Sequence, residues 1–449
     1  LDDEAAIRLS KSPRLTNLSR LQIDEGHMGS TGLTALASSF PQLTSLTLSG
    51  STLQTLTPAR VLASALNSPK LRSLCLIRVD AHPEGVDALA KSPTFEQLKD
   101  LDLGWNAIGD EGVSSLAQGR CQNLQSLNLG SCGMTREGAN ALANGDFESL
   151  TSLDLRWNEI LNEGVRLLSL SKRFSSLTSL CLERARMTRL GVEALCRAPF
   201  LSQLRSLDLG WNRIGAEAIE SLAQCEALQN LEELDLSFTD VDAEGVARVS
   251  QSPHLSGLRS LNLGSAPLGK EGVLALSRSI QLKNLVDLDL YHVGCEDVAL
   301  SALSRSELMW SIRGLNLANN QITSHGAQAL ASSPLIQKLS SLSLASNLIG
   351  DSGVVALSNS SMNPDCLCLS STGLTDRGLK ALSQSEVLRN VRRLDLEMNE
   401  ITNEGAYSLL RSPHLESLIR LDLRATRLTR SMKQSLRERF EPQGTDIQF

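Results

Sequence analysis

One short motif recurs along the whole chain and constrains its fold more than any other feature. The motif LxxLxL occurs sixteen times, and most copies lie 27 residues apart. A unit of this length cannot bury its own apolar face, so consecutive units must stack into a solenoid. The last apolar residues of the copies are Ile23, Leu48, Leu76, Leu103, Leu129, Leu155, Leu182, Leu209, Leu236, Leu263, Leu290, Leu317, Leu344, Leu369, Leu396 and Leu423.

Each unit combines two periodicities. Leu101 and Leu103 alternate as in a strand, whereas Val113 and Leu116 are three residues apart, as on one face of a helix. A turn separates the two segments, and the helices begin with EGV or EGA. We therefore predict an α/β solenoid of about 16 repeats, a horseshoe with parallel strands on its concave face and helices on its convex face.

Two polar positions also recur, and we expect structural roles for both. Asparagines follow the strands and should satisfy backbone groups of the turns. Ser-Pro pairs follow the helices, where proline ends a helix, and this role is favoured over phosphorylation. The asparagines are Asn106, Asn158, Asn212, Asn320, Asn347 and Asn399, and the serines are Ser12, Ser68, Ser92, Ser252, Ser333 and Ser412.

The pattern LxxLxLxxNxIxxxGAxxLA, present as IRGLNLANNQITSHGAQALA and LQSLNLGSCGMTREGANALA, resembles the ribonuclease-inhibitor-like class of leucine-rich repeats. It is most similar to the GALA subclass, found in type III effectors of plant-pathogenic bacteria. The resemblance covers residues 2 to about 437. GALA proteins carry an F-box ahead of their repeats, so the resemblance implies recruitment of a host ubiquitin ligase by a segment before Leu1.

The two ends of the chain differ from its middle. Residues 2–18 align with HPEGVDALAKSPTFEQL, so the solenoid, residues 1–428, begins inside a repeat, and we expect a missing upstream part. Residues 429–449 contain RSMKQSLRERF, a more charged helix than those of the repeats. A terminal repeat needs a polar outer face, so we predict a capping helix followed by a tail.

Composition narrows the classes of partner and compartment. The formal net charge is -7, and the basic residues are scattered, which argues against nucleic acid. The sequence contains no run of 18 uncharged apolar residues, so it predicts no membrane-spanning helix. Nine cysteines in no disulfide spacing favour a reducing compartment. Cys366 and Cys368 form a CxC sequence, but no second Cys or His pair stands nearby, so we predict no metal site. We also expect the protein to be a monomer.

Three of the four tryptophans occupy one position of the repeat, just before the asparagine. Aromatic and arginine side chains are typical of binding hot spots, so we predict a partner-binding surface on the concave face. The alternative is that each indole packs over the neighbouring turn as a spacer. The predicted residues are Trp105, Trp157 and Trp211, continued by Phe238, Tyr291 and His292 and joined by Arg156 and Arg184.

Acidic residues stand between the strand leucines and should face the same side. They could guide a basic partner electrostatically, or they could only keep the strand face solvated. Both interpretations stay open. The residues assigned to the partner-binding surface are Asp102, Asp154, Asp208 and Asp235.

No catalytic or cofactor-binding group is predicted. The sequence CED at Cys295 resembles the Cys-x-Asp motif of bacterial novel E3 ubiquitin ligases. However, Cys295 lies 27 residues after Leu268 and 27 before Ile322, so it should be a buried core residue. The six histidines are dispersed, and no phosphate-binding loop is present.

These features favour a non-catalytic protein-recognition scaffold. The resemblance implies a secreted bacterial effector that binds a host protein in the host cytoplasm. One alternative is the substrate-recognition part of a ubiquitin-ligase adaptor or ligase whose effector domain lies before Leu1. A second alternative is an activator of a small GTPase, similar to the RanGAP type.

Overall fold

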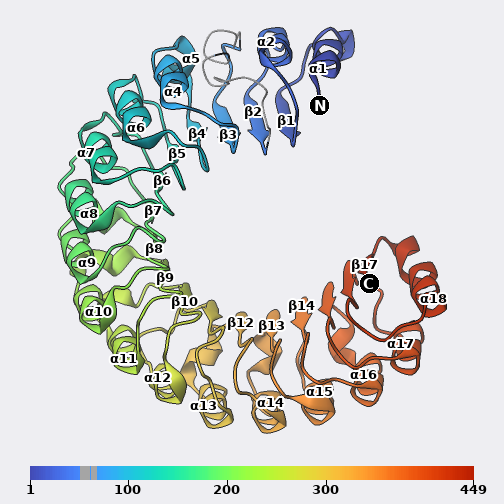
Figure 1. The fold of residues 1–449 in the computed structure, drawn as a ribbon. Coiled ribbons are helices and arrows are strands. Elements are labelled where there is room, and N and C mark those ends of the chain that lie inside the picture. The colour runs from blue at the N-terminus through green and yellow to red at the C-terminus, as the bar shows by residue number, and fades with distance from the viewer. Residues whose placement is uncertain (51–60, 62–67) are drawn as a thin grey trace. The chain divides into compact units, whose positions relative to one another are not determined.

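The computed structural model describes residues 1–50, 61 and 68–449, which form two compact units. The first unit comprises Leu1–Ile214 and Cys225–Leu231, and the second comprises Gly215–Gln224 and Glu232–Phe449. The division falls inside one repeat, whose strand belongs to the first unit and whose helix belongs to the second. Figure 1 shows the order of the helices and strands within each unit.

The first unit alternates strands and helices along the chain. Its strands are β1 (Arg20–Asp24), β2 (Ser45–Ser49), β3 (Ser73–Ile77), β4 (Asp100–Asp102), β5 (Ser126–Asn128), β6 (Ser152–Asp154), β7 (Ser179–Cys181) and β8 (Ser206–Asp208). Its α-helices are α1 (Asp3–Ser10), α2 (Ser30–Ser39), α4 (Pro83–Ala90), α5 (Pro93–Gln97), α6 (Gly109–Gln118), α7 (Arg136–Asn144), α8 (Leu161–Ser169) and α9 (Arg189–Leu195). Short 3-10 helices are η1 (Pro13–Leu15), η2 (Leu201–Gln203) and η3 (Glu226–Asn230).

The second unit continues the same alternation. Its strands are β9 (Glu233–Asp235), β10 (Ser260–Asn262), β11 (Asp287–Asp289), β12 (Gly314–Asn316), β13 (Ser341–Ser343), β14 (Cys366–Cys368), β15 (Arg393–Asp395), β16 (Arg420–Asp422) and β17 (Asp446–Gln448). Its α-helices are α10 (Gly215–Ala223), α11 (Ala243–Gln251), α12 (Gly269–Ser277), α13 (Asp297–Leu303), α14 (Ser324–Ala331), α15 (Gly350–Ser358), α16 (Asp376–Ser383), α17 (Asn403–Leu410) and α18 (Arg430–Phe440). Its 3-10 helices are η4 (Pro253–Leu255), η5 (Glu307–Trp310), η6 (Ile336–Lys338), η7 (Glu386–Leu388) and η8 (Glu441–Gln443).

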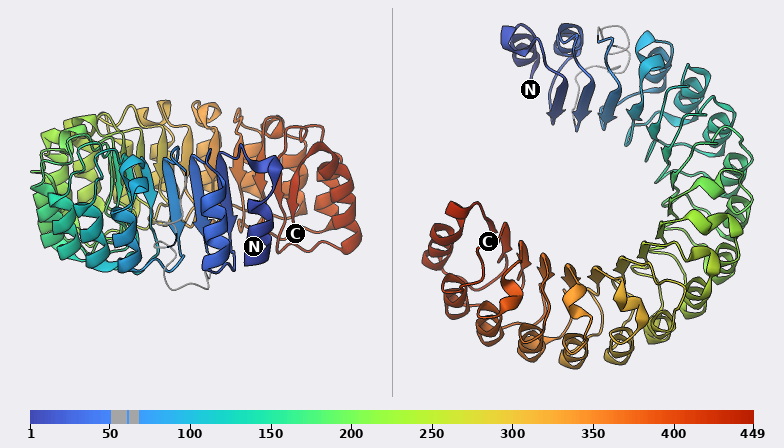
Figure 2. Two further views of the ribbon diagram at one scale, coloured as in Figure 1. Left: turned by 90° about the horizontal axis from the view of Figure 1, so that it is seen from above. Right: turned by 180° about the vertical axis from the view of Figure 1, so that it is seen from behind.

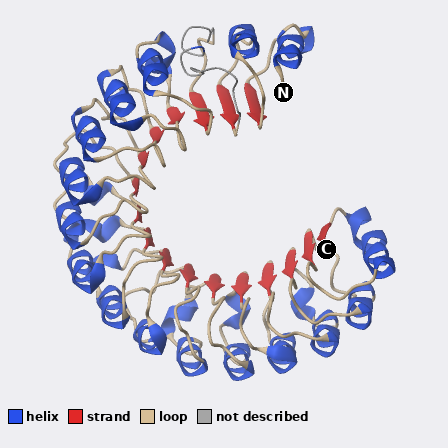
Figure 3. Ribbon diagram, viewed as in Figure 1, coloured by secondary structure: helices blue, strands red, loops and turns tan. Residues whose placement is uncertain are grey.

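Within each unit, the described strands pair in parallel with the strand of the neighbouring repeat, in the register that the leucines predict. Leu101 pairs with Leu127 in the first unit, and Leu261 pairs with Leu288 in the second. In both units the strands line the inner, concave side and the helices lie on the outer side (Figures 2 and 3). The predicted fold class, one parallel strand and one helix per repeat, is therefore confirmed within each unit.

The core lies between the strands and the helices of each unit. The strand leucines, the turn residues such as Ile108 and Met134, and the aromatic residues Phe147 and Phe174 are all buried. This continuous apolar layer explains why short strands of three residues suffice, because each repeat is held mainly by its neighbours. None of the helices in the described parts of the chain combines the length and apolar character that crossing a bilayer demands.

The C-terminal segment contains the predicted helix and one unpredicted strand. Helix α18 buries only Leu436 and Phe440, which leaves a polar outer face. After it, β17 adds to the sheet, with Ile447 paired to Leu421. The sequence DIQ lacks the leucine motif, and therefore sequence analysis treated these residues as a tail.

Candidate functional site

The three tryptophans lie at a turn position that has unusual backbone geometry. In the first unit this position holds the turn row, Arg78, Trp105, Ser131, Trp157, Arg184 and Trp211, and every residue of the row has φ between 52° and 62°. Before Trp211, the backbone N–H groups of the row donate to carbonyls of the next repeat, as from Trp105 to Gly130 at 2.8 Å and from Trp157 to Glu183 at 2.9 Å. The stacking of repeats therefore imposes a left-handed conformation that bulky residues otherwise avoid.

The indole rings of the turn row contact one another. The ring centres of Trp105 and Trp157 are 5.9 Å apart, and those of Trp157 and Trp211 are 6.5 Å apart. These residues belong to every second repeat, so the rings must lean toward each other. The small Ser131 occupies the turn position between Trp105 and Trp157. Such tilted ring pairs contribute about 0.5–1.5 kcal/mol each beyond the area that they bury.

Two arginines of the same row stack on these rings. The Arg78 guanidinium carbon lies 4.6 Å from the Trp105 ring centre, and that of Arg184 lies 4.0 Å from the Trp157 ring centre. Neither guanidinium has a carboxylate partner among the residues that the structure describes. Sequence analysis assigned Arg184 to this surface but missed Arg78, although its position before the asparagine register was visible in the sequence.

The rings keep a large part of their surface in contact with solvent. Trp105, Trp157 and Trp211 are 44%, 36% and 43% exposed. The Trp157 Nε1–H donates to Glu183 Oε1 at 3.0 Å, which fixes the orientation of that indole. The indoles therefore pack on each other, as the spacer interpretation expects, and also present an aromatic surface, as the binding interpretation requires.

Arg156 differs from Arg78 and Arg184 because it is already paired. Its Nε lies 2.7 Å from Asp154 Oδ2, and its Nη1 lies 3.4 Å from Glu183 Oε2. The structure thus places Arg156 beside the turn row but engages its charge within the protein.

The predicted acidic residues have a structural role that sequence analysis did not assign. One carboxylate oxygen of each accepts the backbone N–H two residues later, at 2.8 Å for Asp102, 3.0 Å for Asp154, 2.9 Å for Asp208 and 2.8 Å for Asp235. These bonds close the turn after each strand. We call Asp102, Asp154 and Asp208 of the first unit the acidic row.

The second oxygen of these carboxylates is also engaged. Asn128 donates to Asp102 at 3.1 Å, and the Cys181 thiol donates to Asp208 at 3.1 Å. Burial raises the pKa of Asp102, although the hydrogen bonds from Gly104 and Asn128 oppose this shift. The hypothesis that these carboxylates guide a basic partner stays a prediction, but they are less available than the sequence suggested.

The aromatic residues predicted further along the chain lie in the second unit. Phe238 and His292 occupy the equivalent left-handed turn position, with φ of 52° and 51°. Tyr291 precedes His292, and the two ring centres are 6.0 Å apart. Phe238 and Tyr291 are 42% and 36% exposed.

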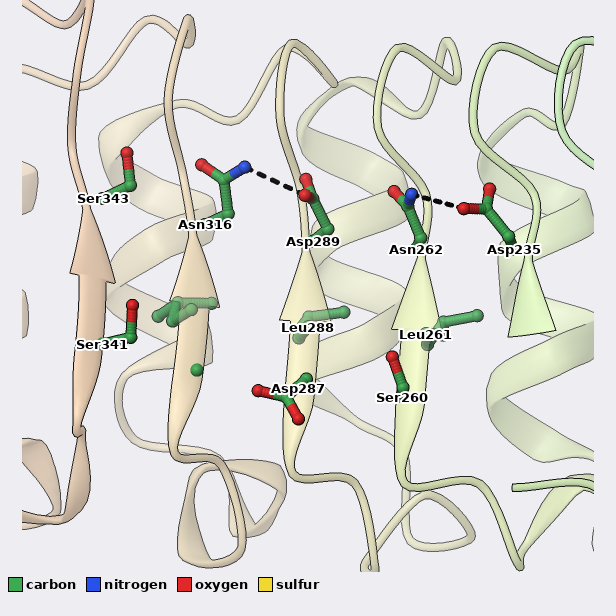
Figure 4. Close-up of a pocket in the computed structure, with 12 residues that line it drawn as sticks. Asp235, Ser260, Leu261, Asn262, Asp287, Leu288, Asp289, Asn316, Ser341 and Ser343 are labelled. Carbon is green, nitrogen blue, oxygen red and sulfur yellow. Dashed lines mark hydrogen bonds between the residues drawn. The ribbon is translucent and has the colours of Figure 1, made fainter. Parts of the chain in front are cut away.

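The strand face of the second unit carries a hollow of about 490 Å³ that sequence analysis missed (Figure 4). Two side-chain hydrogen bonds join neighbouring strands in it: Asn262 donates to Asp235 at 2.7 Å, and Asn316 donates to Asp289 at 2.9 Å. Gly314 is one of its lining residues, and a Cβ there would overlap Asp287 Oδ1. The signal available in the sequence was glycine at a strand position that holds serine or aspartate in the neighbouring repeats.

The cysteine of the CED sequence lies in the core, as its register predicts. Cys295 is fully buried, and burial, aided by Asp297 and Glu296, raises the pKa of its thiol to about 12. A thiol in this state is a poor nucleophile. None of the nine cysteines, all of which lie in the described residues, forms a disulfide bond.

Comparison with known proteins identifies the repeats. Nine segments match a family model described as Leucine Rich repeat, and they are residues 97–117, 120–143, 148–169, 202–223, 227–250, 254–277, 311–331, 336–358 and 387–410. No curated protein gives a significant match to the chain.

Solved structures with leucine-rich repeats resemble the chain at low sequence identity. TLR13, solved in a complex with ssRNA13, is 19% identical over 92% of this chain and 57% of its own, with a TM-score of 0.54. An LRR protein of Leptospira interrogans is 22% identical over 99% of this chain and 98% of its own, with a TM-score of 0.44. The likeness to TLR13 bears on the fold alone. The nine repeat matches and the strand-helix units described above show that the chain is built from leucine-rich repeats.

Proposed function

We propose that this chain is a non-catalytic scaffold that binds a protein partner through the turn row of its first unit. The carrying observation is the cluster of exposed indoles, with ring centres 5.9 and 6.5 Å apart and two arginines stacked on them. Exposed tryptophan and arginine side chains that are already ordered lose little entropy on binding, and they are the side chains that dominate binding energy at interfaces.

The backbone at the turn row supports this proposal. A left-handed conformation favours glycine or asparagine, so the presence of tryptophan at three such positions is not explained by backbone preference. Ser131 and Arg184 adopt the same conformation, so the choice of tryptophan at three of these positions concerns the surface and not the backbone.

The narrower parts of the proposal come from the resemblance to GALA repeats. We propose a host protein as the partner and the host cytoplasm as the compartment, and nine cysteines without a disulfide bond among them fit a reducing compartment.

The test compares two variants of the chain. One replaces Trp105, Trp157 and Trp211 by Ala, and the matched control replaces Trp310, which is 62% exposed in the second unit, by Ala. A partner is first identified by cross-linking and mass spectrometry from host extract, and its affinity is then measured with purified proteins. We expect the triple variant to fold normally and to lose about 2 kcal/mol or more of binding free energy, whereas the control binds unchanged.

Equal affinity of the triple variant and the native chain would refute the proposed site. A ubiquitin-ligase subunit among the cross-linked proteins would favour the adaptor alternative. Stimulated GTP hydrolysis by a captured small GTPase would favour the activator alternative.

A further inference from the structure

We propose that the turn row of the first unit binds an acidic peptide segment of its partner. This inference rests on the proposed function and names the chemistry of the partner. It follows from which parts of the tryptophan and arginine side chains are already occupied, and from which charges of the surrounding rows are already paired.

The faces of the indole rings are largely engaged within the protein. Trp105 contacts the Arg78 guanidinium and Trp157, and Trp157 contacts Trp105, Arg184 and Trp211. The face of an aromatic ring is its electronegative part, and the edge is electropositive. Because guanidinium groups and neighbouring rings already contact Trp105 and Trp157, less of their electronegative ring face is open to a further cation.

The two stacked guanidinium groups supply directional donors at the same surface. Arg78 and Arg184 are exposed and have no carboxylate partner within the described part of the chain. A guanidinium is a planar fork that matches a carboxylate with two parallel hydrogen bonds. Stacking on a ring fixes the orientation of the guanidinium plane, and the N–H groups at its edge can still donate to a carboxylate.

The neighbouring acidic groups do not cancel these charges. Asp102, Asp154 and Asp208 each accept a backbone N–H and a further donor from a side chain. Glu183 binds Arg156 and the Trp157 indole, and Glu159 pairs with Arg186 at 2.9 Å. The carboxylates beside the turn row are therefore mostly hydrogen-bonded within the protein, whereas the guanidinium groups of Arg78 and Arg184 have no carboxylate partner among the described residues.

One acidic residue stands apart from this arrangement. Asp80 is exposed two residues after Arg78, and among the described residues its carboxylate has no hydrogen-bond or ion-pair partner. It weakens the positive potential at the Arg78 end of the row. We therefore expect the Arg184 end to contribute more to binding an acidic segment, and replacement of Asp80 by Asn to strengthen that binding.

The test uses three fluorescein-labelled peptides that share their apolar residues. Each contains three copies of a four-residue unit, Glu-Leu-Asp-Tyr, Gln-Leu-Asn-Tyr or Lys-Leu-Arg-Tyr, and binding to the full chain is measured by fluorescence anisotropy. We expect the acidic peptide to bind about tenfold more tightly than the neutral one, and added salt to weaken it, because charge attraction carries the preference.

Four variants separate the contributions. The double variant Arg78→Ala and Arg184→Ala should weaken the acidic peptide about fivefold or more, whereas the double Lys variant, which keeps charge but loses the planar fork, should be intermediate. Arg120→Ala removes one positive charge elsewhere in the first unit, from a residue that pairs with Glu96, and it should leave binding unchanged. Asp80→Asn should bind the acidic peptide more tightly.

Three results would overturn the inference. They are tighter binding of the basic peptide, acidic-peptide binding that is the same in the double Ala variant, and absence of binding by all three peptides. Any of these leaves the proposed function standing as long as the triple tryptophan variant loses the protein partner. Circular dichroism of each variant excludes loss of folding as the cause.

Discussion

The side-chain amide of Asn158 holds the turn that leads to Met134 in the preceding repeat. Its Oδ1 accepts the Met134 N–H at 2.9 Å and the Cys132 N–H at 3.1 Å, and its Nδ2 donates to the Leu129 carbonyl at 2.8 Å. Asn158 is buried, so water cannot replace these bonds. Each such asparagine joins two repeats by hydrogen bonds that the apolar core cannot provide.

Replacing Asn158 by Ala should destabilise the protein by about 2–4 kcal/mol, because it leaves several buried backbone groups without partners. Asn140 on α7 is exposed and serves as the control, for which Ala should cost less than about 0.5 kcal/mol. The free energy of unfolding in urea measures both. Similar midpoints for the two variants would show that the amide does not hold the turn.

Glycine at the start of α7 is required by close packing. A Cβ at Gly138 would overlap the Met134 side chain and would lie 2.6 Å from Asp110 Oδ1, which accepts the Gly138 N–H. Gly138→Ala should therefore cost about 1–3 kcal/mol through overpacking.

Gly133, in the same repeat, makes a useful comparison. It has φ of 72° and open space around it, so Gly133→Ala should cost only the backbone strain of about 1–2 kcal/mol. A crystal structure should show shifted neighbours for Gly138→Ala and unshifted neighbours for Gly133→Ala. Undisplaced Met134 and Asp110 in the Gly138 variant would contradict the packing argument.

The fold could be predicted well from the sequence because the same pattern of apolar and polar residues recurs in many repeats. The leucines, the turn residues such as Ile108 and the turn asparagines all lie where their register places them. Strand β17 was missed because pairing with β16 depends on backbone groups and not on a leucine pattern. The site was predicted in part: tryptophan exposure followed from register, whereas stacking by Arg78 depends on side-chain geometry that the sequence does not encode directly.

The serine of a Ser-Pro pair is a structural donor. Ser333 is buried, and its hydroxyl donates to the Ser304 carbonyl at 2.6 Å, which satisfies the end of the helix in the preceding repeat. We expect Ser333→Ala to lower the free energy of unfolding by about 1 kcal/mol. Ser12, whose hydroxyl makes no capping bond, is the control.

The same burial predicts how a proline-directed kinase would act on the chain. Ser333 should be phosphorylated in the urea-unfolded protein and protected in the folded protein, as measured by mass spectrometry. Rapid phosphorylation of the folded chain at Ser333 would contradict the structural role.

Asp422 should make stability depend on pH. Burial opposes ionisation of this carboxyl, but hydrogen bonds from Arg424 outweigh burial and lower its pKa below the ordinary 3.8. The unfolded chain therefore binds the proton more readily than the folded chain. The stabilisation is complete above the unfolded pKa, and it is lost as the pH falls through the lower, folded pKa.

Unfolding free energies of the native chain and Asp422→Asn between pH 2 and 7 test this prediction. The difference should be largest above about pH 5 and should shrink toward pH 2. Arg424→Ala removes the bidentate donor and should raise the folded-state pKa of Asp422, so less stability should be lost as the pH falls. A difference that is constant across this range would be inconsistent with the assignment.

The left-handed position of the turn has a consequence for how such a protein can change. Glu25, Ser265, Asn319 and Met398 adopt the same backbone conformation as Trp157. The stacking of repeats sets that conformation whatever side chain is present. Exchanging one non-glycine residue for another there should therefore change the exposed side chains and leave the free energy of folding nearly constant. Substitutions at this position can therefore change which partner the surface binds, one repeat at a time, while the fold of the repeats stays the same.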